Sequence, residues 1–375
     1  MQDFEIIASR AGPDQLHLTA AINADGDSSS TAADVYSQLS SILDTHGMQI
    51  LHERVFGNMD FYNRFTRIRE QCGDFASNPF SYIQGIPCAG RGLAGVQIHA
   101  VRYTSDDCCR IIYHNNVPCG REWKSGNATY TYLAGVTGPG PGTDHRETQA
   151  SRMFDSINRI LASQSLSFHH IARLWIYLAD ILEWYDAFNA VRTEKYKEFD
   201  LIPRGVGNTE MDSIRLPAST GINGRNPAGT AAISDVLAVS GDVQVSVLPG
   251  VQQPSAYRYG SAFSRGVCVQ DAACRQIFVS GTAAIDEQGK SLYPRKVESQ
   301  ILKTIEIVEK LIGQKEAKLE HIRSATVYLK RPEDLCIYQN VAAGFGLDNL
   351  PAVCVAADIC REELLFEMDA LAVVD

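Results

Sequence analysis

The apolar positions of residues 275–375 change between the two-residue period of strands and the longer period of helices. Residues 277–281 form a short β-rich run that ends in glycine. After Pro294, apolar residues recur at helical spacing until Gly313, at Val297, Ile301, Leu302, Ile305, Val308, Leu311 and Ile312. A strand at 324–329, a helix at 334–345 and strands at 352–359 and 364–373 follow. This pattern predicts a β–α–β–α–β–β unit with both helices on one face of a sheet.

The same order of elements occurs earlier in the chain. A strand is predicted at 130–136, a helix at 147–163, a strand at 171–178 and a helix at 182–199. SFHHIARLWIYLAD (167–180) aligns with KLEHIRSATVYLKR (318–331), and LPA at 216–218 aligns with LPA at 350–352. A duplicated unit therefore predicts an α+β fold of two domains: an N-terminal unit with an extension over 1–225, and a C-terminal unit over 226–375.

The first 125 residues have a weaker pattern, which we interpret as the extension of the first unit. Residues 35–43 predict a helix. GVQIHAVRY (95–103) and CRIIYHN (109–115) predict a hairpin joined by the polar residues 104–107.

Composition narrows the classes of partner. The chain has 375 residues and a formal net charge of −10. It lacks the basic footprint of a protein that binds nucleic acid or an anionic membrane, so an anionic ligand would need locally clustered positive charge. No apolar run approaches the ~20 residues of a membrane span, and the N-terminus lacks a signal-peptide pattern. The ten cysteines form no C-x-x-C pair and no zinc spacing. We expect a reduced, cytoplasmic protein with no metal and no cofactor.

Glu367 is the first candidate for catalysis. In the strand predicted at 364–373 it shares a face with Leu365, Asp369 and Leu371. Burial among apolar neighbours would raise the pKa of its carboxyl and make it a general acid. The alternative is that this face is exposed to solvent and Glu367 is a surface acid.

Cys360 and Arg192 are further candidates. Cys360 lies seven residues before Glu367, where it could line the same pocket or act as a nucleophile; a buried structural cysteine is the alternative. Arg192 shares a helix face with Tyr185, Phe188 and Asn189. A guanidinium on such an apolar face needs an anion, either the carboxylate of a ligand or an internal acidic side chain.

The segment PSAYRYGSAFSRG (254–266) interleaves aromatic residues with arginine, including Tyr257, Tyr259 and Arg265. Such a segment suits a planar anionic ligand. An ordered linker between domains would have the same composition, so both interpretations stay open.

The second unit resembles the RidA/YjgF-like proteins. The resemblance rests on the VSGT turn, the HI-x-x-A-x-V-x-L strand, the Leu-Pro-Ala turn and a terminal strand containing FEMDA. The enamine and imine deaminases of that family carry an arginine directly after Pro-Ala, to hold the substrate carboxylate. Here that position is Val353, which argues against deaminase activity.

The whole series of motifs is closer to the chorismatase family, which is built as two RidA-like units. The resemblance covers roughly residues 130–375 and is carried by six motifs in order: RLWIYLADI (173–181), FNAVR (188–192), LPASTGING (216–224), PSAYRY with FSRG (254–266), SGTAAI (280–285) and C-R-x-x-L-x-x-E (360–367). It implies an α+β fold of two RidA/YjgF-like β-α-β-α-β-β units.

The resemblance also implies an activity, the removal of the enolpyruvyl group of chorismate as pyruvate, with no cofactor. Glu367 would protonate the methylene carbon. Arg192 and Arg265 would bind carboxylates. The remaining implied contacts with the substrate are Tyr185, Tyr257, Tyr259, Thr220, Gly221, Gly281, Thr282, Ala283 and Cys360.

For the product, the resemblance points in two directions. Cys360 resembles the members that form hydroxybenzoates, whereas Ala283 resembles those that form a dihydroxycyclohexadiene carboxylate. We favour 3-hydroxybenzoate, with 4-hydroxybenzoate as a possible second product. A RidA-like deaminase and a non-catalytic ligand-binding protein remain as alternatives. We expect a monomer or small homo-oligomer.

Overall fold

The computed structural model describes residues 3–23, 28–103, 108–140, 142–203 and 214–374. Within these residues the chain forms three sheets, each covered by two helices. The first unit comprises β1 (Phe4–Arg10), β2 (Gln15–Ile22), α1 (Ser28–His46), β3 (Met48–Gly57), α2 (Tyr62–Glu70), β4 (Ser81–Gln84) and β6 (Leu93–Arg102). Its strand order is β1-β2-β6-β3-β4, with β3 and β4 parallel.

The second unit has the same topology with one further strand. It comprises β7 (Cys109–His114), β8 (Val117–Ser125), β9 (Ala128–Thr137), α3 (Arg146–Ser163), β10 (Ile171–Leu178), α4 (Tyr185–Glu198), β11 (Ala218–Asn223) and β12 (Ala232–Gly241). The strand order is β11-β10-β12-β9-β8-β7, and β10 and β11 are the parallel pair.

The third unit repeats the second. It comprises β13 (Gln244–Leu248), β14 (Gly266–Gln270), β15 (Arg275–Ala283), α5 (Val297–Gly313), β16 (Ile322–Leu329), α6 (Leu335–Gly344), β17 (Ala352–Ala356) and β18 (Phe366–Val374). Its order is β13-β14-β15-β18-β16-β17, and the short β5 (Ile86–Pro87) adds to β17 at the edge.

The predicted elements of the two repeated units are confirmed to within a few residues, but three expectations need correction. The hairpin of 95–103 with 109–115 is wrong, because β6 pairs with β2 and β3 of the first sheet while β7 pairs with β8 of the second. Of the 125 residues predicted as an extension, most form a sheet of their own (β1, β2, β3, β4 and β6), whereas β7 and β8 belong to the second sheet. In addition, β12 belongs to the second sheet, so that unit continues to Gly241, past the predicted boundary at 225.

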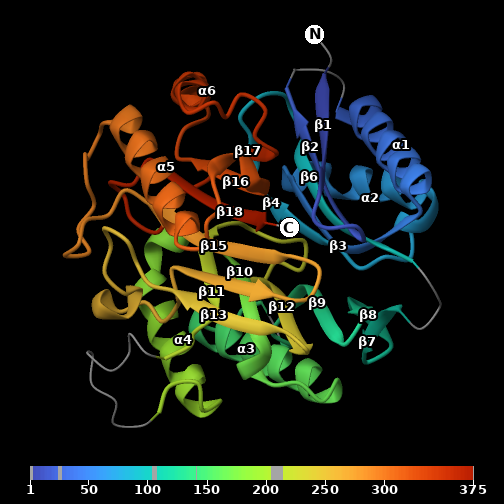
Figure 1. Cartoon of the computed structure of the whole chain (residues 1–375), viewed down its shortest axis with the longest axis horizontal. Helices are drawn as coiled ribbons and strands as arrows, with labels where there is room; N and C mark the ends of the chain where they lie inside the picture. The colour runs from blue at the N-terminus through green and yellow to red at the C-terminus, as the bar shows by residue number, and fades with distance from the viewer. Residues whose placement is uncertain (1–2, 24–27, 104–107, 141, 204–213, 375) are drawn as a thin grey trace.

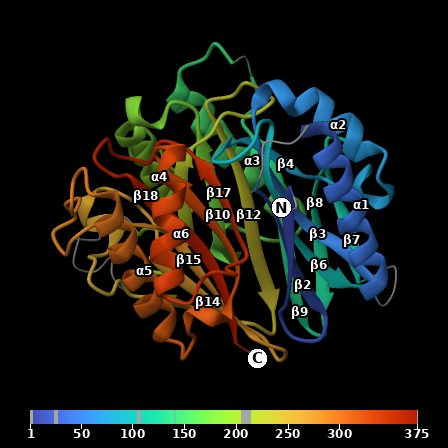
Figure 2. The ribbon, with the colours of Figure 1, turned by 90° about the horizontal axis from the view of Figure 1, so that it is seen from above.

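The three units are arranged with their helices outside and their sheets inside. Figures 1 and 2 show α1 and α2, α3 and α4, and α5 and α6 as three outer pairs. Each pair encloses an apolar core against its own sheet. A fourth core lies between the sheets and contains residues of all three units, such as Phe56, Tyr177 and Tyr328. Both faces of the central strands are therefore buried, which explains how polar side chains come to lie deep in the molecule.

Candidate active site

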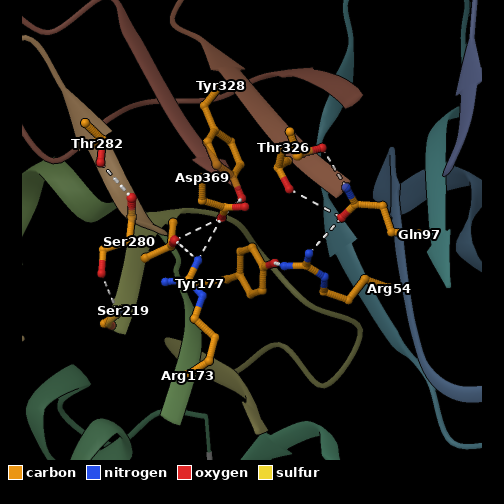
Figure 3. A network of polar contacts seen from close by, with 12 residues as sticks. Arg54, Gln97, Arg173, Tyr177, Ser219, Ser280, Thr282, Thr326, Tyr328 and Asp369 are labelled. Atoms are coloured by element: carbon orange, nitrogen blue, oxygen red, sulfur yellow. Dashed lines mark hydrogen bonds and ion pairs between the residues drawn. The ribbon is translucent and has the colours of Figure 1, made fainter. Parts of the chain in front are cut away.

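The second and third units meet where β11 lies against β15, and hydrogen bonds fix this contact. The backbone N–H of Ser219 donates to Oγ of Ser280 at 2.8 Å, and the Ser280 hydroxyl donates to the carbonyl of Ser264 at 2.5 Å. Figure 3 shows Ser219 and Ser280 facing one another across the contact. The contact brings side chains of both units to one small space.

That space is a cavity of about 30 Å³. Most residues singled out from the sequence are in its wall. The second unit contributes Tyr185, Arg192, Ser219 and Gly221, and the third contributes Phe263, Arg265, Gly281, Ala283, Ile285, Cys360, Arg361 and Glu367.

Glu367 is buried, with 4% of its surface exposed, so the interpretation as a surface acid is wrong. The face of β18 that carries it is covered by the second unit, a contact that the strand pattern alone cannot reveal. Burial raises the pKa of its carboxyl to about 8, and the nearby Asp369 carboxylate adds to this, while Arg173 and Arg265 oppose it. Glu367 is therefore mostly protonated at neutral pH and can donate a proton.

Gly281 makes room for this carboxyl. A Cβ at Gly281 would lie 2.2 Å from Oε1 of Glu367 and 3.1 Å from Cγ2 of Thr220. A side chain at this position would collide with the acid, so glycine is required here by close approach rather than by backbone conformation.

Arg192 has 1% of its surface exposed, and it donates to Oδ1 of Asn189 at 2.5 Å. Its guanidinium carbon lies 5.4 Å from the ring centres of both Phe188 and Phe263. Among the described residues, no carboxylate lies within ion-pair distance of it, and its Nε has no hydrogen-bond partner. The alternative of an internal salt bridge is therefore wrong, and the positive charge faces the cavity.

Helix α2 of the first unit provides an internal comparison. Tyr62, Phe65 and Arg69 have the same spacing as Tyr185, Phe188 and Arg192. There, however, the arginine is paired: Nη2 of Arg69 lies 2.6 Å from Oε2 of Glu53, and Nε donates to Oε1 at 3.0 Å. The two helices thus carry the same Tyr-x-x-Phe-x-x-x-Arg motif. In the first unit the Glu53 carboxylate provides the anion that pairs with its arginine. In the second unit no described carboxylate takes the place of Glu53 beside Arg192.

Two more cations and a thiol complete the wall. Arg265 is 3% exposed and its Nε donates to the carbonyl of Pro254 at 3.1 Å. Arg361 donates to the carbonyl of Gly289 at 2.7 Å. Burial, with a smaller contribution from Glu367, raises the pKa of the Cys360 thiol to about 12. A thiol held in its neutral form is a poor nucleophile, so the geometry favours Cys360 as a wall residue.

Other predicted contacts lie elsewhere. The Thr220 hydroxyl donates to Asp369 at 2.9 Å instead of facing the cavity, and the Thr282 hydroxyl donates to the Ser280 carbonyl at 2.8 Å. Tyr257 packs against the apolar core of the second unit. The side chain of Tyr259 is outside the described part of the structure.

The sequence analysis assigned no role to several residues near the site, namely Arg173, Ser219, Phe263, Arg361 and Asp369. Each left a signal, since the first four lie within the quoted motifs and Asp369 alternates onto the same strand face as Glu367. Within the described ranges, no group of three or more His, Cys, Asp or Glu side chains is placed to hold a metal ion. In the same ranges, no helix is both long and apolar enough to cross a membrane.

The chain is similar to known proteins in sequence and in fold. The family model described as Endoribonuclease L-PSP matches residues 255–374. A Streptomyces hygroscopicus protein named chorismatase is 25% identical over 289 residues, covering 71% of this chain and 80% of the relative. A 3-hydroxybenzoate synthase from the same organism is 24% identical over 268 residues, covering 64% and 73%.

A solved structure extends the comparison to the fold. The crystal structure of a chorismatase matches with a TM-score of 0.60 at 17% sequence identity, over 86% of this chain and 92% of that chain. These findings confirm the resemblance to the chorismatases and the α+β, RidA-like fold that the motifs indicate.

Proposed function

We propose that this chain, whose similarity to the chorismatases spans most of its length, removes the enolpyruvyl group of chorismate as pyruvate. One observation carries the proposal: the buried carboxyl of Glu367 and the guanidinium groups of Arg192 and Arg265 line the same cavity. A protonated acid beside buried cations suits a reaction that begins with protonation of a carbon atom in an anionic substrate.

Glu367 starts the reaction by giving its proton to the methylene carbon of the enolpyruvyl group. Its O–H bond breaks as the new C–H bond forms, and the ether carbon becomes an oxocarbenium centre. Water adds to this centre and returns a proton to Glu367. The resulting hemiketal transfers its hydroxyl proton to the ring oxygen as that C–O bond breaks, which releases pyruvate and a dihydroxycyclohexadiene carboxylate.

A second route, which gives a hydroxybenzoate, needs no added water. The neighbouring hydroxyl group of the ring adds to the oxocarbenium centre and gives its proton back to Glu367, which forms a cyclic ketal. One ring C–O bond then breaks and its oxygen becomes the ketone oxygen of pyruvate, while the ketal bond to the other ring oxygen breaks. The ring carbon that keeps this oxygen loses its proton, which ends on the oxygen as the ring becomes aromatic. Cys360 lies in the wall beside Glu367 and Ala283, where it would limit the access of water to the cation. We favour 3-hydroxybenzoate as the main product, and the similarity to a 3-hydroxybenzoate synthase supports this choice.

The arginines balance the two carboxylates of the substrate. Arg192 and Arg265 are each at least 97% buried, where ionic hydrogen bonds are stronger than in water. Because the cavity measures only about 30 Å³, a substrate must displace side chains of the wall when it binds.

The deaminase alternative receives no support from the geometry at Val353. This residue is fully buried, and its methyl groups lie 2.7 Å from the position of a Cβ built on Gly95 of the first unit. The position that holds the carboxylate-binding arginine of deaminases is therefore an apolar contact between units.

The purified chain incubated with chorismate is expected to release pyruvate, and chromatography is expected to show 3-hydroxybenzoate. Since the pKa of Glu367 is about 8 and the protonated form is the active one, kcat/KM should stay level below pH 8 and fall about tenfold per pH unit above it. Absence of pyruvate above the uncatalysed rate would contradict the proposal. A rate that rises with pH through this range would remove Glu367 from its role as an acid.

Gly281→Ala is expected to lower kcat/KM for chorismate about 100-fold, because the new methyl group displaces the Glu367 carboxyl. The fold should survive, since the displaced atom is the end of a flexible side chain. Gly313→Ala is the matched control, because a Cβ at this helix end meets nothing within 4 Å. Equal activities of the two variants would show that the position of the carboxyl is not limiting.

A further inference from the structure

A buried network of polar groups lies next to the cavity, outside its wall. Asp369 has 3% of its surface exposed, and its Oδ2 accepts a hydrogen bond from the Thr220 hydroxyl at 2.9 Å. The same oxygen lies 3.2 Å from Nη2 of Arg173, which also donates to Thr220. Figure 3 shows Arg173 and Asp369 approaching one another from separate strands.

These side chains join the two units that build the site. Thr220 is on β11 and Arg173 on β10 of the second unit, whereas Asp369 is on β18 of the third. Thr220 directly precedes Gly221 of the cavity wall, and Asp369 follows Glu367 by two residues on the same strand face. The network therefore joins the strand that carries the proton donor to the strands of the anion-binding unit, two residues from Glu367 on β18 and one residue from Gly221 on β11.

We propose that Asp369 is a positioning residue of the reaction, which holds Glu367 in register with the anion-binding side of the cavity through Thr220 and Arg173. The expected effect of this positioning on kcat rests on the proposed function. Its structural premise, the closeness of the Asp369 carboxylate to the Glu367 carboxyl, can be tested without any substrate.

The contact between the first and second units carries an equivalent network, with an apolar residue at the position of Glu367. Asp235 lies opposite Trp175 in the second sheet, as Asp369 lies opposite Thr326 in the third. It accepts hydrogen bonds from the hydroxyl of Ser81 and, at 2.8 Å, from the backbone N–H of Gly135.

The residue two positions before Asp235 shows how the two networks differ. It is Ile233, which lies opposite Tyr177, whereas Glu367 lies opposite Tyr328. Ser81 thus offers a matched control for Thr220, since each supplies one hydroxyl to an equivalent aspartate between two units.

The kinetic test compares Thr220→Val with Ser81→Ala. Thr220→Val keeps the shape of the side chain but removes the hydroxyl, and it is expected to lower kcat about tenfold with KM changed less than about threefold. Thr220→Ser should restore the rate to within about threefold. Thr220→Val and Ser81→Ala should lower the melting temperature by similar amounts, because each removes one hydroxyl from an equivalent network. Ser81→Ala should leave kcat unchanged, because its network lies beside Ile233 rather than a catalytic acid.

The test without substrate follows the carboxylic-acid C=O stretch of Glu367 by infrared titration, with Glu367→Gln to assign the band. The wild-type midpoint should lie near pH 8. In Asp369→Asn it should move to lower pH, because a like charge is lost while Arg173 and Arg265 still face Glu367 and the Cys360 thiol stays neutral.

These measurements separate failure of the inference from failure of the proposed function. If the wild-type chain releases no pyruvate, the function is wrong and the infrared titration decides the role of Asp369 alone. Equal kcat in Thr220→Val and Ser81→Ala, or an unchanged midpoint in Asp369→Asn, would overturn the inference.

Discussion

Glu367→Gln is expected to lower kcat for pyruvate release by about 10²- to 10⁴-fold, the range for loss of a general acid. Glutamine keeps the size of the side chain but has no proton acidic enough to give to carbon. Chorismate should still bind with an affinity within a few-fold of wild type, because Arg192 and Arg265 are untouched. Single-turnover kinetics and equilibrium binding measure the two effects separately.

The same substitution should make the folded protein more stable at neutral pH. In the unfolded chain the carboxyl ionises near its ordinary pKa of 4.5, whereas in the folded protein it keeps its proton up to about pH 8. The free energy of unfolding of the wild type therefore falls as pH rises from 4.5 to 8. Glutamine has no such penalty, so the variant gains up to about 3 kcal/mol at pH 7.

Unfolding measurements at two pH values check this second effect. At pH 4 both states of the wild type are protonated, so the two proteins should be equally stable. If Glu367→Gln gains the same free energy of unfolding at pH 4 and at pH 7, the gain comes from packing rather than from removal of the buried acid. Turnover within tenfold of wild type would exclude Glu367 as the proton donor.

The sequence predicted the parts of each unit well, because those parts depend on local patterns. The strand at 171–178 was predicted with the bounds that the structure has, and the helix at 147–163 differs from α3 by one residue. Helical spacing and strand alternation are set within one unit and its own core. They therefore survive in a single sequence even when the rest of the fold is unknown.

The contacts between units could not be predicted in the same way. Alternation in β18 separates Glu367 from Phe366 but does not say that a second sheet covers the Glu367 face. The repeat formed by the first unit was missed because its strands share few residues with those of the other two units. The spacing of Tyr62, Phe65 and Arg69 in α2 repeats that of α4, so a search for this motif would have found it.

The candidate site shows the same division. The side chains that belong to motifs, such as Glu367 and Arg192, could be singled out from the sequence. Asp369 and Arg173 could not be assigned a role, because their function depends on a contact between strands far apart in the chain. The identity of an acid can be read from a pattern, but its protonation at neutral pH requires knowledge of what buries it.

Arg192→Met should lower kcat/KM for chorismate about 100-fold or more, because a buried ionic contact with a substrate carboxylate is lost. The variant should unfold at the same temperature as the wild type or higher. Among the described residues Arg192 has no carboxylate partner, so its charge is buried at a cost that methionine, of similar volume, removes. Kinetics with chorismate and thermal unfolding without it measure the two effects.

Arg69→Met, at the equivalent position of α2, should behave in the opposite way. Removing this guanidinium leaves the carboxylate of Glu53 buried, with the Tyr36 hydroxyl as its remaining donor, which should lower the free energy of unfolding by about 3–5 kcal/mol. The kcat/KM of the folded fraction should match the wild type, because Arg69 is in another unit from the cavity. If instead Arg192→Met destabilises the protein as much as Arg69→Met while retaining activity, Arg192 is a structural cation. The opposite effects of the two substitutions would show that one arginine motif serves folding in the first unit and binding in the second.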